Sequence, residues 1–230
     1  MSARRTATTS IFLLLGVAGL LSATSGFEFR HGSLWMGNAY RSPWTETTVE
    51  GSEASPLLTL TGASYTFVLT PDLQLSPGID LWYRDFAFTE DRAVPTQIET
   101  APGDDREVAG TLGVFLSVPI EYTYPVSERW FIRTGFSPTT LYRIPVAPVE
   151  ASPTDNLTRF FFERGRFLFP EIRLGFGYHM EERVTFQFSG RWMMPLWRLW
   201  DGGPDLPWWD SHMVSGQLGV RIRRPAPDQQ

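Results

Sequence analysis

Apolar and polar residues alternate along most of this chain, with the period of two that is typical of β-strands. Segments rich in Val, Phe, Tyr, Trp, Thr and Leu are separated by clusters of Gly, Pro, Asp and Ser. The pattern predicts eight strands, and no segment indicates a helix. The predicted strands span residues 27–37, 56–70, 73–88, 107–123, 129–144, 165–179, 184–198 and 212–223.

Short and long connections alternate strictly between these strands. The short ones are Pro71-Asp72, Tyr124 to Glu128 and Met180 to Arg183, and the long ones span 38–55, 89–106, 145–164 and 199–211. Barrels of the outer membrane have short periplasmic turns and longer extracellular loops. Eight strands with both termini on the periplasmic side need three turns and four loops, and this is the number that the sequence contains.

The two faces of each predicted strand differ in chemistry. In 107–123, alternate positions from Val108 to Tyr122 are apolar or glycine, and the intervening positions are mostly small or polar, with Glu121 among them. In 165–179, Ile172 and Leu174 alternate with the charged Glu171 and Arg173. A soluble ligand-carrying barrel also alternates, but with its apolar face inward. Charges of both signs in the middle of strands favour an apolar exterior in lipid and a polar interior.

These observations predict an all-β protein: a closed, eight-stranded, antiparallel, up-and-down transmembrane β-barrel. Closure follows because hydrocarbon offers no hydrogen-bond partner to an unpaired backbone N–H or C=O group. Aromatic residues gather near both predicted ends of the strands, as expected for side chains at the two membrane–water interfaces. They are Tyr122, Tyr124, Trp130 and Tyr178 at the turn end, and Trp35, Tyr83, Tyr142, Trp197 and Trp200 at the loop end.

The N-terminal segment has the features of an export signal. Arg4 and Arg5 precede a short apolar run from Ile11 to Leu21, and small residues follow at 23–25. The run is too short for a membrane-spanning helix, which needs about 20 apolar residues. We therefore predict a signal peptide over 1–25, cleaved near Ser25 and Gly26. The predicted barrel spans 26–223, and a polar tail spans 224–230.

Composition narrows the possible functions. The chain has no cysteine, which excludes disulfides, thiolate metal sites and a lipoprotein anchor. Its formal charge is −5, and loss of Arg4 and Arg5 with the signal would make it −5 − 2 = −7. An acidic protein of this kind is not expected to bind nucleic acid. The three histidines, His31, His179 and His212, are dispersed, so no metal site and no cofactor are expected.

Over 27–223 the chain resembles the small bacterial outer-membrane barrels of the OmpA, OmpX and OmpW kind. The resemblance is one of pattern rather than of a shared motif. Members of that class typically end on an aromatic residue that the assembly machinery reads, whereas here the alternating Val220 and Ile222 lead into Arg223 and the tail. The resemblance implies a location in the bacterial outer membrane. It also implies contacts with outer-membrane lipid or lipopolysaccharide and with the barrel-assembly machinery.

Charged residues on the polar face are the main candidates for a functional site. Eight strands leave an interior just wide enough for side chains to fill, and an unpaired charge there would be costly, so these residues should pair across the lumen and plug it. This predicts a structural or surface-interaction role. The alternative within the same fold is narrow, porin-like transport of small solutes. The predicted lumen charges are Glu28, Arg30, Asp80, Arg84, Glu121, Arg133, Glu171, Arg173, Arg191 and Arg221.

A lipid A-modifying enzyme is the alternative of another class. Lipid A deacylases of this size use a His and a Ser two residues apart on a lipid-facing strand, and His31 and Ser33 have that spacing. A nucleophile and its base also need a third group that orients the base, and the sequence places no carboxylate for this pair.

The long loops are a third candidate, because Trp200, Trp208 and Trp209 stand among aspartates and could contact a surface ligand.

Overall fold

The fold is described by a computed structural model. It covers residues 25–36, 40–41, 48–49, 57–89, 92–95, 107–148, 168–194 and 212–223. The predicted tail, the predicted signal peptide up to residue 24 and most of the predicted long loops lie outside the described residues. No helix in the described part of the chain is long and apolar enough to cross a membrane.

The described residues form strands joined by short turns. The strands are β1 (Gly26–Met36), β2 (Tyr40–Arg41), β3 (Thr48–Val49), β4 (Leu58–Val68), β5 (Leu73–Leu75), β6 (Gly78–Thr89), β7 (Arg92–Pro95), β8 (Glu107–Ser117), β9 (Ile120–Pro125), β10 (Trp130–Pro148), β11 (Leu168–His179), β12 (Val184–Met193) and β13 (Met213–Arg223).

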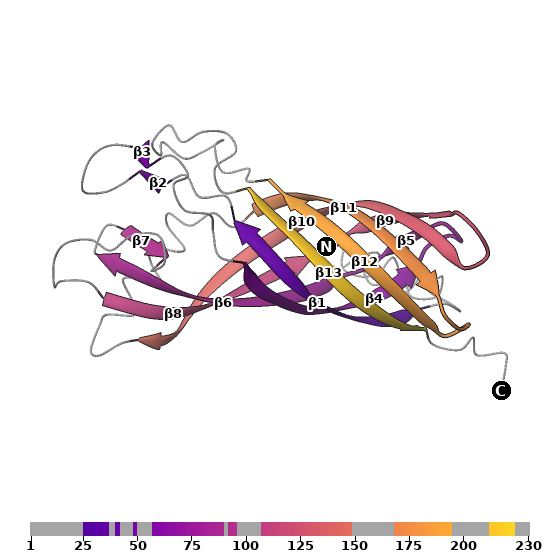
Figure 1. Ribbon diagram of the computed structural model, residues 1–230, viewed down its shortest axis with the longest axis horizontal. Coiled ribbons are helices and arrows are strands. Elements are labelled where there is room, and N and C mark those ends of the chain that lie inside the picture. The colour runs from indigo at the N-terminus through magenta and orange to yellow at the C-terminus, as the bar shows by residue number, and fades with distance from the viewer. Residues whose placement is uncertain are drawn as a thin grey trace, which may run out of the picture.

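Eight wall segments close into a barrel, as the alternation predicts (Figure 1). They are β1, β4, β5 with β6, β8 with β9, β10, β11, β12 and β13, and each pairs antiparallel with the next. The ring closes because β13 also pairs with β1, from Gly26 opposite Arg223 to Met36 opposite Met213. The predicted fold class is confirmed.

Two predicted loops contain strands, and one strand is longer than predicted. β10 continues to Pro148, although we expected a loop from Pro145. A bulge between Pro145 and Ala147 lets the pairing with β8 continue past the proline, which has no N–H to donate. β7 lies within the predicted loop 89–106 and pairs with the end of β6, and β2 pairs with β3 within the predicted loop 38–55.

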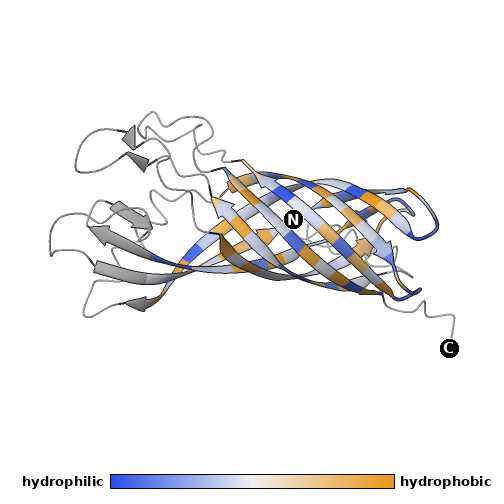
Figure 2. Cartoon of the chain, in the orientation of Figure 1, coloured by the Kyte–Doolittle hydropathy of each residue, from blue (hydrophilic) through white to orange (hydrophobic). Residues whose placement is uncertain are grey.

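The two faces of the wall have the predicted chemistry. Leu116, Ile172 and Leu174 are exposed on the outside, whereas Glu171 and Arg173 are buried inside. The alternation of hydrophilic and hydrophobic residues along each strand is visible in Figure 2. An apolar exterior around a polar interior is the arrangement of a transmembrane barrel and the reverse of a soluble one.

A row of prolines crosses four neighbouring wall segments and explains why two of them are interrupted. Backbone N–H groups of Tyr65, Ser76, Val118 and Met194 donate to the carbonyls of Pro77, Pro119, Pro138 and Pro170, at 3.0, 3.0, 3.4 and 2.9 Å. None of these pairs can form the reciprocal bond, because proline has no N–H. The breaks between β5 and β6 and between β8 and β9 fall at the first two prolines.

Candidate functional site: the barrel lumen

All ten predicted lumen charges have buried side chains. Their exposed fractions range from 0% for Asp80 and Glu171 to 5% for Arg173 and Arg221. They come from β1, β6, β9, β10, β11, β12 and β13, so the closure of the barrel brings them together. Alternation along each strand sends all of them inward.

Five of these residues form a cluster toward the loop end of the lumen, which we call the loop-side cluster: Arg30, Asp80, Glu171, Arg173 and Arg191. Arg191 bridges its two carboxylates: Nη1 lies 2.6 Å from Asp80, and Nε and Nη2 each lie 2.8 Å from Glu171. Arg30 lies 3.1 Å from Asp80, and Arg173 forms an ion pair with Glu171. Arg191 therefore links β12 to β6 and β11.

Neutral side chains satisfy the remaining polar groups of the loop-side cluster. Gln217 donates to Asp80 at 3.1 Å, and Thr139 donates to Glu171 at 2.6 Å. Arg30 donates to Ser64 at 3.0 Å, and Arg173 donates to Ser117 at 2.9 Å. Buried ion pairs are stable only when such additional hydrogen bonds are made. Sequence reasoning did not identify these neutral partners, although each is a buried residue on the inward face of its strand.

A second cluster lies nearer the turn end, and we call it the turn-side cluster: Glu28, Glu121, Arg133 and Arg221, with Gln74 and Gln187. Arg221 Nη2 lies 2.6 Å from Glu28. Gln74 accepts a hydrogen bond from Arg221 at 2.9 Å and donates one to Glu121 at 2.9 Å. Arg133 donates to Gln187 and lies over the ring of Phe131, 4.9 Å from its centroid. The two clusters form successive polar layers across the lumen.

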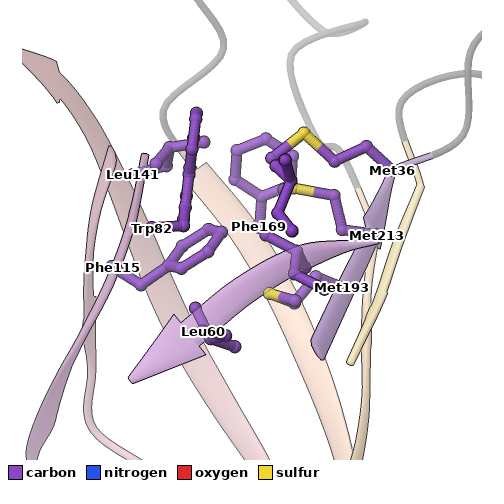
Figure 3. Packing of buried hydrophobic residues seen from close by; sticks show 10 residues of the cluster. Met36, Leu60, Trp82, Phe115, Leu141, Phe169, Met193 and Met213 are labelled. Carbon is purple, nitrogen blue, oxygen red and sulfur yellow. The ribbon is translucent and has the colours of Figure 1, made fainter. Parts of the chain in front are cut away.

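Toward the loop end the lumen is mostly apolar, which the sequence analysis did not predict; Arg84 of β6 and its strand partner Thr111 of β8 are also buried at that end. Buried hydrophobic side chains from all eight wall segments meet there, and Figure 3 shows their packing. We call this group the apolar cap. Its members are Leu34, Met36, Leu58, Leu60, Trp82, Phe115, Leu141, Phe169, Met193 and Met213.

The cap is packed closely enough to require a glycine. Gly113 is the strand partner of Trp82, and a Cβ at Gly113 would lie 1.9 Å from the Trp82 indole. The ring therefore lies flat across the neighbouring strand, where only glycine leaves room. Trp82 and Phe115 are in aromatic contact, with ring centroids 6.5 Å apart. Arg84 follows Trp82 on the inward face of β6 and is also buried.

One signal in the sequence could have revealed the cap. At the loop ends of several strands the alternation gives way to consecutive apolar residues, as in Leu34-Trp35-Met36 and Trp192-Met193-Met194. There, Trp35 and Trp192 face outward while Leu34 and Met193 are buried inside. Apolar residues on both faces of a barrel strand indicate that the interior at that level is apolar too.

His31 and Ser33, the catalytic candidates, both face outward on β1. Nδ1 of His31 shares a hydrogen bond with the Thr61 hydroxyl at 2.9 Å. Among the described residues, no carboxylate contacts this histidine, so the third member of a catalytic triad is not found in that part of the chain.

The other two histidines lie elsewhere on the barrel. His179 stacks on Phe131 at the turn end, and His212 accepts a hydrogen bond from the Trp192 indole at 3.0 Å.

The predicted interfacial aromatics that the structure describes lie at the two ends of the outer wall. Tyr122, Tyr124 and Trp130 are exposed at the turn end, where Trp130 packs against Tyr178 with centroids 4.5 Å apart. At the loop end, the exposed rings are Trp35, Tyr83 and Tyr142, joined by Trp192. Trp197 and Trp200, and the loop tryptophans at 208 and 209, lie outside the described residues.

Comparison with known proteins supports the fold but does not assign the chain to a family. No protein-family model and no curated protein matches the sequence. Neisserial surface protein A is similar in structure, with a TM-score of 0.52, 9% sequence identity and coverage of 86% of this chain and 96% of that one. OprG from Pseudomonas aeruginosa covers 89% and 98% at 10% identity, with a TM-score of 0.45. Ail, the attachment invasion locus protein of Yersinia pestis, covers 88% and 99% at 8% identity, also with a TM-score of 0.45.

Proposed function

We propose that this protein is a bacterial outer-membrane barrel whose lumen is sealed, and that it has a structural or surface-interaction role rather than a transport role. The apolar outer wall and the aromatic rows at its two ends support the membrane location. In that location, the wall would contact outer-membrane lipid or lipopolysaccharide, and the long loops would present the surface that meets a ligand.

The observation that supports the proposal is the succession of three layers of buried side chains along the lumen. The turn-side cluster and the loop-side cluster are ion-paired layers, and the apolar cap packs toward the loop end. A hydrated ion that passed through would have to separate buried ion pairs and then enter an apolar constriction. Hydrophobic constrictions exclude water, and a charge without water or a partner is costly.

Conductance in planar bilayers tests this proposal. We expect the wild-type barrel to insert without steady conductance steps. A six-residue variant should conduct, because it removes large side chains from all three layers without changing the net charge: Phe115→Ala and Met193→Ala in the cap, Glu171→Ala and Arg191→Ala in the loop-side cluster, and Glu28→Ala and Arg221→Ala in the turn-side cluster. Regular steps from the wild-type protein would overturn the sealed lumen.

The matched control separates the cap from the ion-paired layers. Phe115→Ala with Met193→Ala alone thins the cap but leaves the ion-paired layers, so we expect this variant to stay closed. Conductance from the cap variant at the level of the six-residue variant would mean that the charged layers form a path rather than a seal. That result would favour the transport alternative.

A further inference from the structure

Two buried polar side chains toward the loop end of the lumen make no hydrogen bond with any residue that the structure describes. They are Trp82 of β6, through its indole Nε1, and Thr111 of β8, through its hydroxyl. Trp82 is 2% exposed and Thr111 is 0% exposed. Nearly all buried polar groups in proteins are hydrogen bonded, because an unpaired one destabilises the fold. Two such groups on neighbouring strands therefore indicate a partner that the described chain does not supply.

The strand register places these two side chains in one compact block. On the inward faces of β6 and β8, Trp82 is the strand partner of Gly113, and Arg84 is the strand partner of Thr111. The indole crosses from β6 onto β8, where a Cβ at Gly113 would lie 2.4 Å from Nε1. Thr111 is the next inward residue on β8, so the indole N–H lies over the position beside it. We call Trp82, Arg84 and Thr111 the donor block.

The chemistry of the donor block selects the kind of ligand. An indole N–H and a guanidinium can only donate hydrogen bonds, and a hydroxyl can donate one as well. A ligand that satisfies Trp82 and Thr111 together must therefore present acceptor oxygens. Arg84 is buried beside Thr111, and its positive charge favours oxygens that carry negative charge, because charge-assisted hydrogen bonds are the stronger ones.

The position of the donor block indicates the side from which a ligand reaches it. β6 runs toward the loop end, so Arg84 lies nearer the loops than Trp82 does. β8 runs in the opposite direction, so Thr111 lies nearer the loops than Gly113 does. A ligand from the loop side therefore meets Arg84 and Thr111 without crossing either of the ion-paired layers.

A third buried hydroxyl shows what is particular to the donor block. Ser215 of β13 is 2% exposed and also makes no hydrogen bond with a described residue. It lies on the opposite side of the ring from β8. Its strand partner is Arg191, whose guanidinium contacts Asp80 and Glu171. Ser215 is thus a single hydroxyl beside a charge that already has two carboxylates, and it serves as a matched control.

We propose that the donor block binds an oxyanion: a carboxylate or phosphate group of a ligand that reaches the barrel from the loop side. Oxygens of this group accept the hydrogen bonds of the Trp82 indole and the Thr111 hydroxyl, and the charge of Arg84 favours its binding. The inference deepens the surface-interaction role and rests on it, because it gives the chemistry of the group that this role would recognise.

An NMR titration of the folded barrel in detergent micelles tests the site. The indole signal of Trp82 is identified as the proton–nitrogen correlation that is missing from Trp82→Phe. Sodium acetate and sodium phosphate are added separately, with sodium chloride at the same ionic strength as the control. We expect a saturable downfield shift of the Trp82 indole proton with acetate or with phosphate, and the two salts distinguish a carboxylate from a phosphate ligand. A signal that responds to neither salt, or equally to sodium chloride, would overturn the proposal and leave ordered water as the partner.

Matched variants locate the anion, with dissociation constants measured by calorimetry for the salt that gives the shift. Thr111→Val keeps the shape of the side chain and removes the hydroxyl, and Trp82→Phe keeps an aromatic ring and removes the N–H. We expect each to raise the dissociation constant by roughly tenfold, as the loss of one hydrogen bond to a charged group should. Ser215→Ala should leave it unchanged. Wild-type affinity in either donor variant would contradict the proposed contacts.

Two further measurements separate this inference from the proposed function. Heat-modifiable mobility on every sample identifies the variants that form the barrel, and affinities are compared among those. Conductance of the wild type in planar bilayers would overturn the sealed lumen. A sealed barrel whose Trp82 indole signal does not respond to either anion would overturn the oxyanion site alone.

Discussion

The charged middle of the lumen and its apolar loop end fill the same barrel by different physical means. In the middle, the geometry of the ion pairs determines which side chains meet. Arg191 reaches Asp80 and Glu171 at once, and each carboxylate has further hydrogen-bond donors. At the loop end, large buried side chains from every wall segment pack against one another. The charged layers should therefore fail when one partner is lost, whereas the cap should weaken in proportion to the volume removed.

Removing Asp80 should have the largest effect on stability. Asp80→Ala leaves the buried guanidinium of Arg30 without its ion-pair partner and removes one of the two carboxylates that Arg191 contacts. We expect the free energy of unfolding to fall by about 3–5 kcal/mol, measured by urea titration of barrels in lipid vesicles. Asp80→Asn is the control, because it keeps the shape of the side chain and should lower the free energy of unfolding by less than Asp80→Ala. An effect under about 1 kcal/mol for Asp80→Ala would show that the cluster is hydrated rather than sealed.

Truncating a side chain of the apolar cap should lower the free energy of unfolding somewhat less than Asp80→Ala does. Leu60→Ala removes a fully buried side chain, and the expected loss is about 2–4 kcal/mol in the same titration. Leu174→Ala is the matched control on the lipid-facing side, where acyl chains can fill the space that the side chain leaves. If both substitutions cost the same, the loop end of the lumen is not closely packed.

Two inward glycines should respond differently to an added methyl group. Gly113→Ala in the cap would collide with Trp82, and we expect it to destabilise the barrel by about 1–3 kcal/mol. Gly175→Ala lies at the level of the charged residues, where a Cβ would meet its nearest atoms at 3.4 Å, so we expect little change. Equal effects in the unfolding titration would contradict the difference in packing.

Raising the salt concentration should have the smallest effect on the free energy of unfolding. Ion pairs this deeply buried are poorly screened, so raising NaCl from roughly 0.1 to 1 M should change the free energy of unfolding by less than about 1 kcal/mol. A steep loss of stability with salt would mean that water and ions reach the clusters.

The wall was predictable from the sequence because period-two alternation reports the two faces of a strand directly. The same alternation assigned all ten charged residues to one face, and all ten are buried in the lumen. Which charges pair was not predictable, because pairing depends on the stagger between strands: Arg191 and Asp80 are separated by 111 positions in the sequence. The proline row was likewise hidden, since each proline is unremarkable until the registers align them.

The cap was missed for a different reason. The rule that inward residues are polar holds for the middle of this barrel and fails at its loop end, where Phe115 and Phe169 point inward. The consecutive apolar residues at the loop ends of the strands mark the cap, because there both faces of the wall are apolar at the same level. The His31-x-Ser33 spacing resembles a catalytic pair, and both residues lie on the outward face of β1, between β13 and β4.

The most direct test of the sealed lumen compares thiol reactivity at two neighbouring positions of β12. Ser189 faces inward at the level of the charged clusters and Phe188 faces outward, 7% and 54% exposed respectively. Ser189→Cys and Phe188→Cys are reconstituted in vesicles and treated with a charged maleimide from each side and with a membrane-soluble one. We predict that Ser189→Cys reacts with neither until the barrel is unfolded, while Phe188→Cys reacts with the membrane-soluble reagent. Rapid labelling of Ser189→Cys in the folded barrel by the charged reagent would contradict the account.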